Sequence, residues 1–385
     1  MQAIILAAGE GSRLRPLTQN RPKALLPVAG KPILGHVITS LRAAGIRDII
    51  VVVGYRSEMV MKYLSGFDEI VVVHQSTQLG TADAVAAALP LVTENVLILP
   101  GDNYISSTSI MDLIRHTNSV LVTRSKESAR YGVLTLKDNY ITSIQEKPKY
   151  VTSMLISCGA YHIAHSLCAS IPSYGYDMTD FLEAIISHVP FTAVHTDEWE
   201  DAIWPWHLLG LNDSLLSQIS TIKHGKISSR AVIEGKVFIG KGATIGPYTH
   251  ITGPAYIGED VTLPSHVVIG PGCSIGARSS IGPFTTLTHS LLMEDITIQG
   301  QGYISDSVIG ESCHIHTATK LIPGEGAMKM PQGDLVESHF GAIMGSDVLI
   351  GAGSMLSHAV IGNGAKIGIG CHVSSALIAD QMQVR

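Results

Sequence analysis

Residues 1–27 have the sequence MQAIILAAGEGSRLRPLTQNRPKALLP, and this stretch decides the fold of the first half of the chain. The apolar run over residues 3–8 predicts a short buried strand. It leads into a glycine-containing turn, residues 9–12, which is followed by the cations Arg13 and Lys23. Glycine lets backbone N–H groups approach an anion closely, and nearby cations neutralise its charge. The stretch therefore predicts a phosphate-binding loop that follows a strand.

The spacing of the glycines in this loop fits neither G-x-x-x-x-G-K-[ST] nor G-x-G-x-x-G, two common phosphate-binding motifs. The longer string Gly-x-Gly-Ser-Arg-Leu-Arg-Pro-Leu-Thr, followed by Arg-Pro-Lys, resembles the signature loop of the sugar-1-phosphate nucleotidylyltransferases. The resemblance implies that Arg13 and Lys23 are catalytic. It also implies a first set of substrate-contacting residues, which are Leu6, Ala8, Gly9 and Gly11.

Composition narrows the class of protein. A chain of 385 residues is long enough for two domains, each with a core. Its net charge of −6 argues against a general nucleic-acid binder, which is normally basic. No apolar stretch approaches the length of a membrane span, and no charged-then-apolar leader opens the sequence. The five cysteines are scattered without a C-x-x-C pair, so we expect reduced thiols and a cytoplasmic location.

Up to about residue 220, apolar runs alternate with helical patterns. This order predicts an α/β domain with a doubly wound, mostly parallel sheet of the Rossmann-like type. In such a sheet the ligand crevice lies beyond the carboxyl ends of the strands, where the glycine loop and Asp102 fall. The predicted strands cover residues 3–8, 48–53, 71–74, 96–100 and 120–123, and the predicted helices cover residues 33–44 and 82–91.

From about residue 227 aliphatic side chains recur every six positions, often with glycine directly after them. A period of six fits neither an amphipathic helix nor strand alternation, and it is typical of a parallel β-helix with three hexads per turn. We predict a nucleotidylyltransferase domain over 1–220 and a left-handed hexapeptide β-helix over 221–385, with a loop extruded at 323–338. The inward positions expected are Ile227, Ile233, Ile239, Ile245, Ile251, Ile257, Leu263, Ile269, Ile275, Ile281 and Leu287, and, after the register slips, Ile298, Ile304, Ile309, Ile315, Leu321, Ile343, Leu349, Met355, Ile361, Ile367 and Val373.

Residues 75–84 resemble the segment with which the nucleotidylyltransferase family contacts the base. A glutamine there supplies a donor and an acceptor to a pyrimidine edge, and a glycine permits close approach to the nucleoside. The resemblance makes Gln75, Gly80 and Thr81 substrate-contacting residues. Thr81 has a second, structural interpretation, because a threonine at this point can cap the helix predicted from residue 82.

Two aspartates are the candidate metal ligands. Asp102 ends the segment Leu-Pro-Gly-Asp, and Asp201 lies in a segment resembling the family's Trp-x-Asp-x-Gly-x-Pro-x-Asp-Leu-Leu. The resemblance implies that both bind Mg²⁺, and hard carboxylate oxygens are the ligands that this ion prefers. Taken alone, an aspartate at the end of a strand more often forms a turn.

The sugar side is also assigned by resemblance. Residues 131–133 and 145–148 resemble the sugar-side motifs, in which Gly132 lies against the sugar, Glu146 accepts its hydroxyls and Lys147 contacts its phosphate. A surface β-hairpin with an exposed charge pair is the structural alternative. Gly159 belongs to a segment that departs from the family's Asn-x-Gly-x-Tyr, because a serine replaces the asparagine. Two further departures follow Asp201, where Ile203 replaces a glycine and His207 replaces an aspartate.

The implied reaction is an in-line attack by a sugar-1-phosphate oxygen on the α-phosphorus of a nucleoside triphosphate, which expels pyrophosphate without a covalent enzyme intermediate. Two polyanions must be brought together, so catalysis rests on positioning and charge neutralisation. Asp102 and Asp201 hold Mg²⁺ in this scheme. Arg13 and Lys23 stabilise the triphosphate, and Lys147 orients the attacking phosphate.

The substrates follow from a finer resemblance. Gln-Leu-Gly-Thr at 78–81 resembles the uridylyltransferases that make UDP-N-acetylglucosamine more than the thymidylyltransferases that make dTDP-glucose. The β-helix resembles that of the enzymes combining N-acetylglucosamine-1-phosphate uridylyltransferase with glucosamine-1-phosphate acetyltransferase activity. We expect UTP with N-acetylglucosamine-1-phosphate or glucose-1-phosphate. The alternatives are a glucose-1-phosphate thymidylyltransferase, a bifunctional enzyme that also acetylates an amino-sugar phosphate, and a regulatory subunit that binds nucleotide sugar without turnover.

In the bifunctional enzymes the acetyl-CoA site lies between β-helices of neighbouring subunits, and a histidine shortly before a tyrosine is the general base. Here Tyr303 is present, but Gly300 stands at the histidine position. His289, His314 and His316 are the histidines closest in sequence. We therefore favour a β-helix that assembles the protein as a trimer or a dimer of trimers over one that acetylates.

Overall fold

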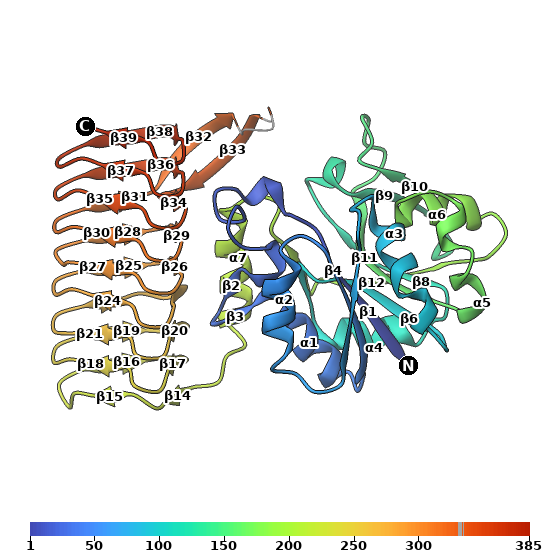
Figure 1. Ribbon diagram of the computed structural model, residues 1–385, viewed down its shortest axis with the longest axis horizontal. Coiled ribbons are helices and arrows are strands. Elements are labelled where there is room, and N and C mark those ends of the chain that lie inside the picture. The colour runs from blue at the N-terminus through green and yellow to red at the C-terminus, as the bar shows by residue number, and fades with distance from the viewer. Residues whose placement is uncertain (330–332, 334) are drawn as a thin grey trace. The chain divides into compact units, whose positions relative to one another are not determined.

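The computed structural model describes residues 1–329, 333 and 335–385. Its contacts divide these residues into two compact units, and each is treated by itself below (Figure 1). The division does not follow the chain in one cut, because short N-terminal segments group with the C-terminal half. The first unit consists of Met1–Glu10, Pro22–Leu25 and Ile33–Asp201, and the second of Gly11–Arg21, Leu26–Pro32 and Ala202–Arg385.

The first unit is built on one mixed sheet. Among the described residues its strand order is β5-β4-β1-β6-β11-β8-β12-β10-β9. The first four of these strands run parallel, while β11 runs antiparallel to β6 and β8. The strands are β1 Gln2–Ala7, β4 Asp48–Val53, β5 Ile70–His74, β6 Val96–Pro100, β8 Ser119–Arg124, β9 Gly132–Lys137, β10 Tyr140–Glu146, β11 Leu155–Ile163 and β12 Thr192–His195, with the separate pair β7 Asn103–Ile105 and β13 Trp199–Asp201.

The helices of the first unit cover both faces of this sheet. Strand β1 is buried on both faces of the sheet. Its successive residues Ile4 and Ile5 are both fully buried, but they belong to different hydrophobic clusters on opposite faces. A strand buried on both faces needs apolar side chains at every position. The helices are α1 Ile33–Ala43, α2 Ser57–Leu64, α3 Thr81–Ala88, α4 Ser107–Ile114, α5 His165–Cys168 and α6 Met178–Ile185, and α7 His207–Leu216 belongs to the second unit.

The predicted α/β fold is confirmed, with boundaries that agree to within a few residues. The strands expected over 48–53 and 96–100 are β4 and β6 as predicted. The helix expected over 82–91 is α3, which ends at Ala88 and continues as the 3-10 turn Leu89–Leu91. Pro90 lies in this turn, and a proline cannot donate to an α-helical hydrogen bond.

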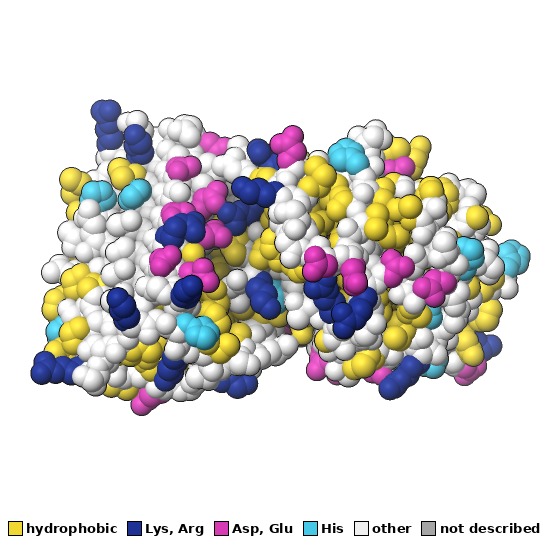
Figure 2. All heavy atoms as spheres, turned by 60° about the horizontal axis from the view of Figure 1, so that its bottom comes forward, with side chains coloured by type: hydrophobic (Ala, Val, Ile, Leu, Met, Phe, Trp, Pro, Cys, Tyr) yellow, Lys and Arg dark blue, Asp and Glu magenta, His cyan; other side chains and the backbone are white. Residues whose placement is uncertain are grey.

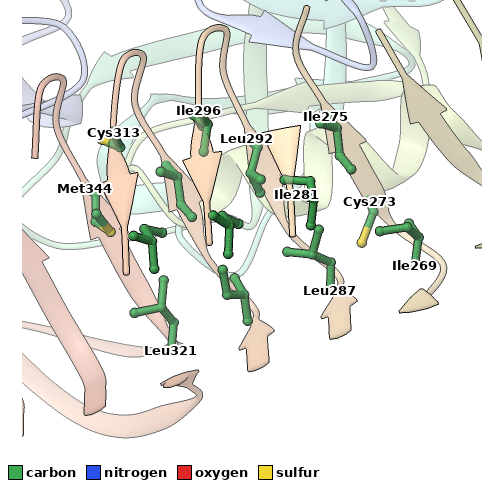
Figure 3. Close-up of a cluster of buried hydrophobic side chains, with 14 of the residues drawn as sticks. Ile269, Cys273, Ile275, Ile281, Leu287, Leu292, Ile296, Cys313, Leu321 and Met344 are labelled. Atoms are coloured by element: carbon green, nitrogen blue, oxygen red, sulfur yellow. The ribbon is translucent and has the colours of Figure 1, made fainter. Parts of the chain in front are cut away.

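The second unit contains a parallel β-helix, which confirms the prediction from the six-residue period. Strands of successive turns pair in parallel about 18 residues apart, as Ile245 with Leu263, and then 17 apart, as Ile281 with Ile298. Figure 3 shows the inward aliphatic side chains stacked along the axis. The glycines after them permit this stacking, since a Cβ on Gly246 would lie 1.3 Å from the carbonyl oxygen of Pro264.

Two sheets and one hairpin make up the β-helix (Figure 1). One sheet contains β14 Ile222–Lys223, β16 Val232–Glu234, β17 Val237–Ile239, β19 His250–Thr252, β20 Ala255–Ile257, β22 Val268–Ile269, β23 Cys273–Ile275, β25 Thr286–Thr288, β26 Leu291–Leu292, β28 Tyr303–Ser305, β29 Val308–Ile309, β31 Lys320–Ile322, β34 Ala342–Met344, β36 Met355–Ile361 and β38 His372–Ile378. The other contains β15 Lys226–Ile227, β18 Thr244–Ile245, β21 Thr262–Leu263, β24 Ser280–Ile281, β27 Thr297–Ile298, β30 His314–Ile315, β35 Leu349–Ile350, β37 Lys366–Ile367 and β39 Gln383–Val384.

The predicted register is wrong by one residue at three late positions. Met344 stacks on Ile309, and Ile350 stacks on Ile315, so Ile343 and Leu349 are not the inward residues there. In the same way Leu356 replaces the predicted Met355, because it pairs with Leu321. The extruded segment at 323–338 forms an antiparallel hairpin of β32 Gly324–Lys329 and β33 Leu335–Phe340, and residues 330–332 and 334 of the predicted loop lie outside the described residues.

The outer surface carries charges of both signs, in keeping with the modest net charge of −6. Figure 2 shows one face of the molecule, on which acidic and basic side chains are intermixed. All five cysteines are free. In the described part of the chain, no helix combines the length and the apolar character that crossing a membrane requires.

Candidate active site

Lys23, Asp102 and Asp201 meet in the first unit. The Lys23 ammonium lies 3.0 Å from Oδ2 of Asp102 and 2.7 Å from Oδ1 of Asp201. Asp102 lies two residues after the end of β6, and Asp201 ends β13, whose pairing with β7 places it opposite Asn103. The short β7–β13 ladder therefore brings together two carboxylates that are far apart in sequence.

The lysine between the carboxylates is buried, with 7% of its surface exposed. Burial alone would lower the pKa of Lys23, but the charges of Asp102 and Asp201 outweigh burial and raise this pKa above its usual value. The ammonium is therefore held charged. A desolvated cation in this position interacts strongly with any phosphate oxygen that approaches it.

The two carboxylates have the chemistry of a divalent-metal site. Because one ammonium lies within 3.0 Å of an oxygen of each carboxylate, both oxygens converge on a single point that already holds a positive charge. Among the described residues no group of three or more acidic, histidine or cysteine side chains forms a closed metal cage. Mg²⁺ commonly takes one or two carboxylates and completes its shell with water and substrate phosphate, so two carboxylates are enough.

A pocket of about 350 Å³ opens beside Asp102. It lies at the carboxyl ends of β1 and β6, as the position of a crevice in an open α/β sheet predicts. Glycines and apolar residues make up most of its lining, and a few polar side chains complete it. This combination is common in ligand sites. The predicted site residues that line it are Leu6, Ala8, Gly9, Gln75, Gly80, Thr81, Asp102 and Gly159.

Gln75 is held in one orientation at the wall of this pocket. Only 5% of its surface is exposed, and its amide nitrogen donates to Oδ2 of Asp83 at 2.6 Å and to the carbonyl of Gly80 at 3.3 Å. Both partners are oxygens, and a carboxylate can only accept, so the nitrogen must face them. The side-chain oxygen of Gln75 is thereby left to accept a hydrogen bond from a ligand.

The residues predicted to contact the sugar also lie together. A Cβ on Gly132 would lie 3.4 Å from Oε2 of Glu146 and 3.2 Å from Cγ2 of Thr179, so this glycine packs closely against both side chains. The neighbouring Lys147 pairs with Oε1 of Glu146 at 2.5 Å. Residues 132 and 146 are opposite each other in the β9–β10 ladder. The strands thus form the hairpin considered as the structural alternative, and this hairpin carries the predicted sugar-side residues.

Gly11 and Arg13 belong to the second unit. Gly11 has a left-handed backbone with φ of 69°, and its carbonyl accepts a hydrogen bond from the Thr18 hydroxyl at 2.8 Å. Arg13 lies in the 3-10 turn Ser12–Leu14 that begins directly after Gly11. The catalytic role of Arg13 stays a prediction.

Thr81 does not cap its own helix, so that prediction is wrong. Thr81 is the first residue of α3, and its backbone N–H and hydroxyl donate to Oδ1 of Asp177 at 3.1 and 3.2 Å. Asp177 therefore supplies the acceptor at this helix N-terminus, and it also lines the pocket. A Cβ on Gly80 would lie 2.3 Å from the carbonyl oxygen of residue 176, which explains the glycine.

Sequence reasoning missed several residues of the site, among them Asp83, Gln78 and Tyr161. Asp83 orients Gln75, and Tyr161 and Gln78 line the pocket. Asp83 lies in the first turn of α3, a position that the predicted helix start already indicated as close to the base-contacting segment. Tyr161 is the tyrosine of the segment that resembles Asn-x-Gly-x-Tyr, and it lies on the long strand β11, so the same resemblance could have found it.

The thiol of Cys158, which the charge of Asp201 affects, is unreactive at neutral pH. Burial, together with the charge of Asp201, raises the pKa of Cys158 well above its usual value. The same two causes raise the pKa of Tyr131. Both groups stay protonated at neutral pH, so neither is a nucleophile or base for the reaction.

Comparison with known proteins identifies the family of the chain. A model of the nucleotidyl transferase family matches residues 2–220, and a model of the GMPPB C-terminal domain matches residues 251–325. The bifunctional protein GlmU of Methanococcus maripaludis (strain S2) is 31% identical over 388 residues, which cover 96% of this chain and 94% of the relative. GlmU of Methanocaldococcus jannaschii is 30% identical over 395 residues, covering 99% and 95%.

A bifunctional sugar-1-phosphate nucleotidylyltransferase/acetyltransferase of Sulfurisphaera tokodaii is 30% identical over 333 residues, covering 83% of this chain and 82% of the relative. The family model spans more than half of the chain, and the two GlmU proteins align with nearly all of it. With a pocket at the carboxyl ends of the parallel strands and a lysine between two carboxylates beside it, the chain belongs to the nucleotidyl transferase family.

Proposed function

We propose that this enzyme, a sugar-1-phosphate nucleotidyltransferase, transfers uridylyl from UTP to N-acetylglucosamine-1-phosphate or glucose-1-phosphate and releases pyrophosphate. The observation that carries the proposal is the Lys23 ammonium held between Asp102 and Asp201 at the edge of the pocket. The curated relatives support the sugar-phosphate class, because one of them is named a bifunctional sugar-1-phosphate nucleotidylyltransferase/acetyltransferase. Its test is a pyrophosphate-release panel that crosses four nucleoside triphosphates with glucose-, glucosamine- and N-acetylglucosamine-1-phosphate.

Charge explains how these residues act. The reaction brings a phosphate monoester onto a triphosphate, so mutual repulsion is the main obstacle. Lys23 faces the reacting phosphates as a fixed, desolvated cation, and Lys147 pairs with the acceptor phosphate. Asp102 and Asp201 would hold Mg²⁺, which supplies further positive charge to phosphate oxygens when bound. No general base is needed on the nucleophile, because a phosphate oxygen is already deprotonated at neutral pH.

The orientation of Gln75 favours a particular class of base. Its side-chain oxygen is left as an acceptor, so it pairs with a base that presents an N–H at that edge. Uracil and thymine offer such an N–H at N3, whereas cytosine offers a lone pair at the same position. The geometry therefore supports UTP or dTTP over CTP.

Replacing Asp83 with asparagine is expected to weaken this discrimination. An asparagine can either donate or accept, so the amide of Gln75 is free to turn and present its nitrogen to the base. We compare kcat/KM for UTP with kcat/KM for CTP. We expect this ratio to fall about tenfold, because one hydrogen bond no longer distinguishes the two bases. Initial rates with the two nucleotides measure the ratio, and an unchanged ratio in Asp83→Asn would show that Asp83 does not set it.

The β-helix is proposed to assemble the protein rather than to acetylate. Gly300 carries no side chain at the position where the resemblance requires a histidine, and its φ of +122° disfavours any other residue. His289 cannot take the place of the missing histidine. Its hydrogen bonds to Asp213 and Asp306 outweigh the opposing effect of burial and raise the pKa of His289 to about 9. It is therefore protonated at neutral pH and is not a base.

We expect little or no acetyl transfer from acetyl-CoA to glucosamine-1-phosphate. An amine nucleophile is mostly protonated at neutral pH and needs a positioned base, and the usual pKa of a tyrosine such as Tyr303 is too high for that role. A thiol-release assay with and without the amino-sugar phosphate measures the activity. Robust release that depends on the sugar phosphate would refute this expectation. Loss of that release in His316→Ala would identify His316, which lines a hollow of about 300 Å³, as the base.

The full chain is expected to be a trimer or a dimer of trimers. A prism of stacked hexads presents flat sides, and the resemblance to bifunctional uridylyl- and acetyltransferases implies packing of three such prisms around an axis. Multi-angle light scattering at micromolar concentration should give a multiple of three times the 41.0 kDa of one chain. A monomer at that concentration would contradict the expectation. The cytoplasmic location predicted from the scattered cysteines stays a prediction.

A further inference from the structure

The segments that carry or flank the catalytic residues group with the β-helix. Arg13 lies within Gly11–Arg21, which belongs to the second unit. Lys23 lies in the four-residue stretch Pro22–Leu25, which has a second-unit segment on each side of it in the sequence. Asp201 is the last residue of the first unit before the chain joins the second. Three separate sets of contacts hold these neighbouring segments on the β-helix.

The first set holds the signature loop. Asn363, which is 7% exposed, donates from its amide to the carbonyl of Pro16 at 3.3 Å and to Oε1 of Gln19 at 3.1 Å. Gln19 in turn donates to Oδ2 of Asp380 at 2.6 Å. At the end of the loop, Arg21 pairs with carboxylates from two turns of the β-helix, Glu294 and Glu311.

The second set holds the segment that follows Lys23. Gly30, with φ of +83°, packs on the ring of Tyr256, and a Cβ at this glycine would lie 2.2 Å from ring atoms. The fully buried Asn212 of α7 accepts from the backbone N–H of Ala29 at 3.0 Å and donates to the carbonyl of Gly272 at 3.0 Å. One amide side chain thus ties the segment, α7 and the β-helix together.

The third set follows Asp201. The rings of Trp204 and Trp206 stack at 5.8 Å, and Trp206 stacks on Phe340 of the β32–β33 hairpin at 5.1 Å with an interplanar angle of 5°. Phe340 is fully buried and also contacts the ring of His358. Stacked aromatic contacts of this kind fix the backbone that emerges from the metal-ligand segment.

We propose that the β-helix is a positioning element of the nucleotidyl transfer site, which it serves by holding the signature loop through Arg21 and Gln19. The inference rests on the proposed function, which it extends to residues far outside the pocket. A loop that closes on a triphosphate loses conformational entropy. Anchors that hold the loop before the nucleotide arrives remove part of that loss, so they raise apparent affinity and rate.

The test uses the full-length chain and variants on both sides of the contact. Arg21→Ala and the double variant Glu294→Gln/Glu311→Gln remove the same ion pairs from opposite partners. We expect each to lower kcat/KM for the nucleoside triphosphate about tenfold, because the competent loop conformation becomes less populated. Arg21→Lys should recover part of the loss. Arg278→Ala is the matched control, since Arg278 pairs with Asp295 on the β-helix and should leave the rate unchanged.

Hydrogen exchange separates positioning from a direct role of Arg21. Loss of an anchor should speed amide exchange over residues 11–21 in both the Arg21 and the glutamate variants, but not in Arg278→Ala. A rate loss confined to Arg21→Ala, with the glutamate variants at wild-type rate and exchange, would overturn the proposal. If the wild type showed no turnover with any substrate pair, the proposed function would fail, while the exchange experiment would still decide whether the β-helix orders the loop.

Discussion

Substitution of Asp102 or Asp201 by asparagine is expected to abolish Mg²⁺-dependent turnover while the chain stays folded. Asparagine keeps the size of the side chain but removes the charge that a hard cation requires. Each aspartate is also one of the two carboxylates that hold Lys23 charged. We expect a loss of at least about a hundredfold in kcat, comparable to the removal of one electrostatic group aimed at a transition state.

The measurement is the initial rate of pyrophosphate release over a magnesium titration. A matched control is Asp112→Asn, because Asp112 pairs in an exposed position with Arg115, the residue that follows α4. Circular dichroism and thermal melting should show the folded chain in all three variants. Near-normal rates for either site variant at modest magnesium would remove that aspartate from the proposed metal site.

Replacement of Lys23 by alanine is expected to lower the rate by orders of magnitude. The lysine is a buried cation, and the proposed mechanism places it where phosphate charge develops, so water cannot easily replace it there. Its removal also leaves Asp102 and Asp201 facing each other without a cation between them. We expect the defect mainly in kcat, because a charge that develops during the reaction loses its partner.

The raised pKa of Lys23 adds a pH dependence to this prediction. A group whose pKa is raised on folding contributes stability below its unfolded value and loses it as pH rises through the folded value. The Lys23 contribution should therefore be fully present from about pH 6 to pH 9, and activity should show no loss there from its deprotonation. If Lys23→Ala changed only KM for the sugar phosphate, Lys23 would belong to the sugar site.

Local patterns accounted for most of the fold. Strands buried on both faces, such as β1 and β4, are continuous apolar runs, and the hexads of the β-helix repeat a side-chain type at a fixed spacing. The sequence held a signal that could have corrected the late register. Met344 and Ile350 are directly followed by glycine, as inward residues of earlier turns often are. The pattern of aliphatic residues alone could not choose between neighbours, because Ile343 is equally apolar.

Long-range contacts were beyond sequence reasoning. The approach of Lys23 to both aspartates depends on β13 pairing with β7, and no spacing in the sequence encodes that register. The grouping of the signature loop with the β-helix depends on Asn363, more than three hundred residues later in the chain. The candidate site residues were predicted from a resemblance to a family. The structure shows which contacts hold several of them in place.

The most direct test of the central claim is the rate of pyrophosphate release by the wild-type chain with UTP and Mg²⁺, with and without N-acetylglucosamine-1-phosphate or glucose-1-phosphate. Because the sugar phosphate is the nucleophile, the account predicts release only when one of them is present, with one UDP-sugar formed for each pyrophosphate. Release that is independent of any sugar phosphate, or the absence of release with every pair tested, would contradict it.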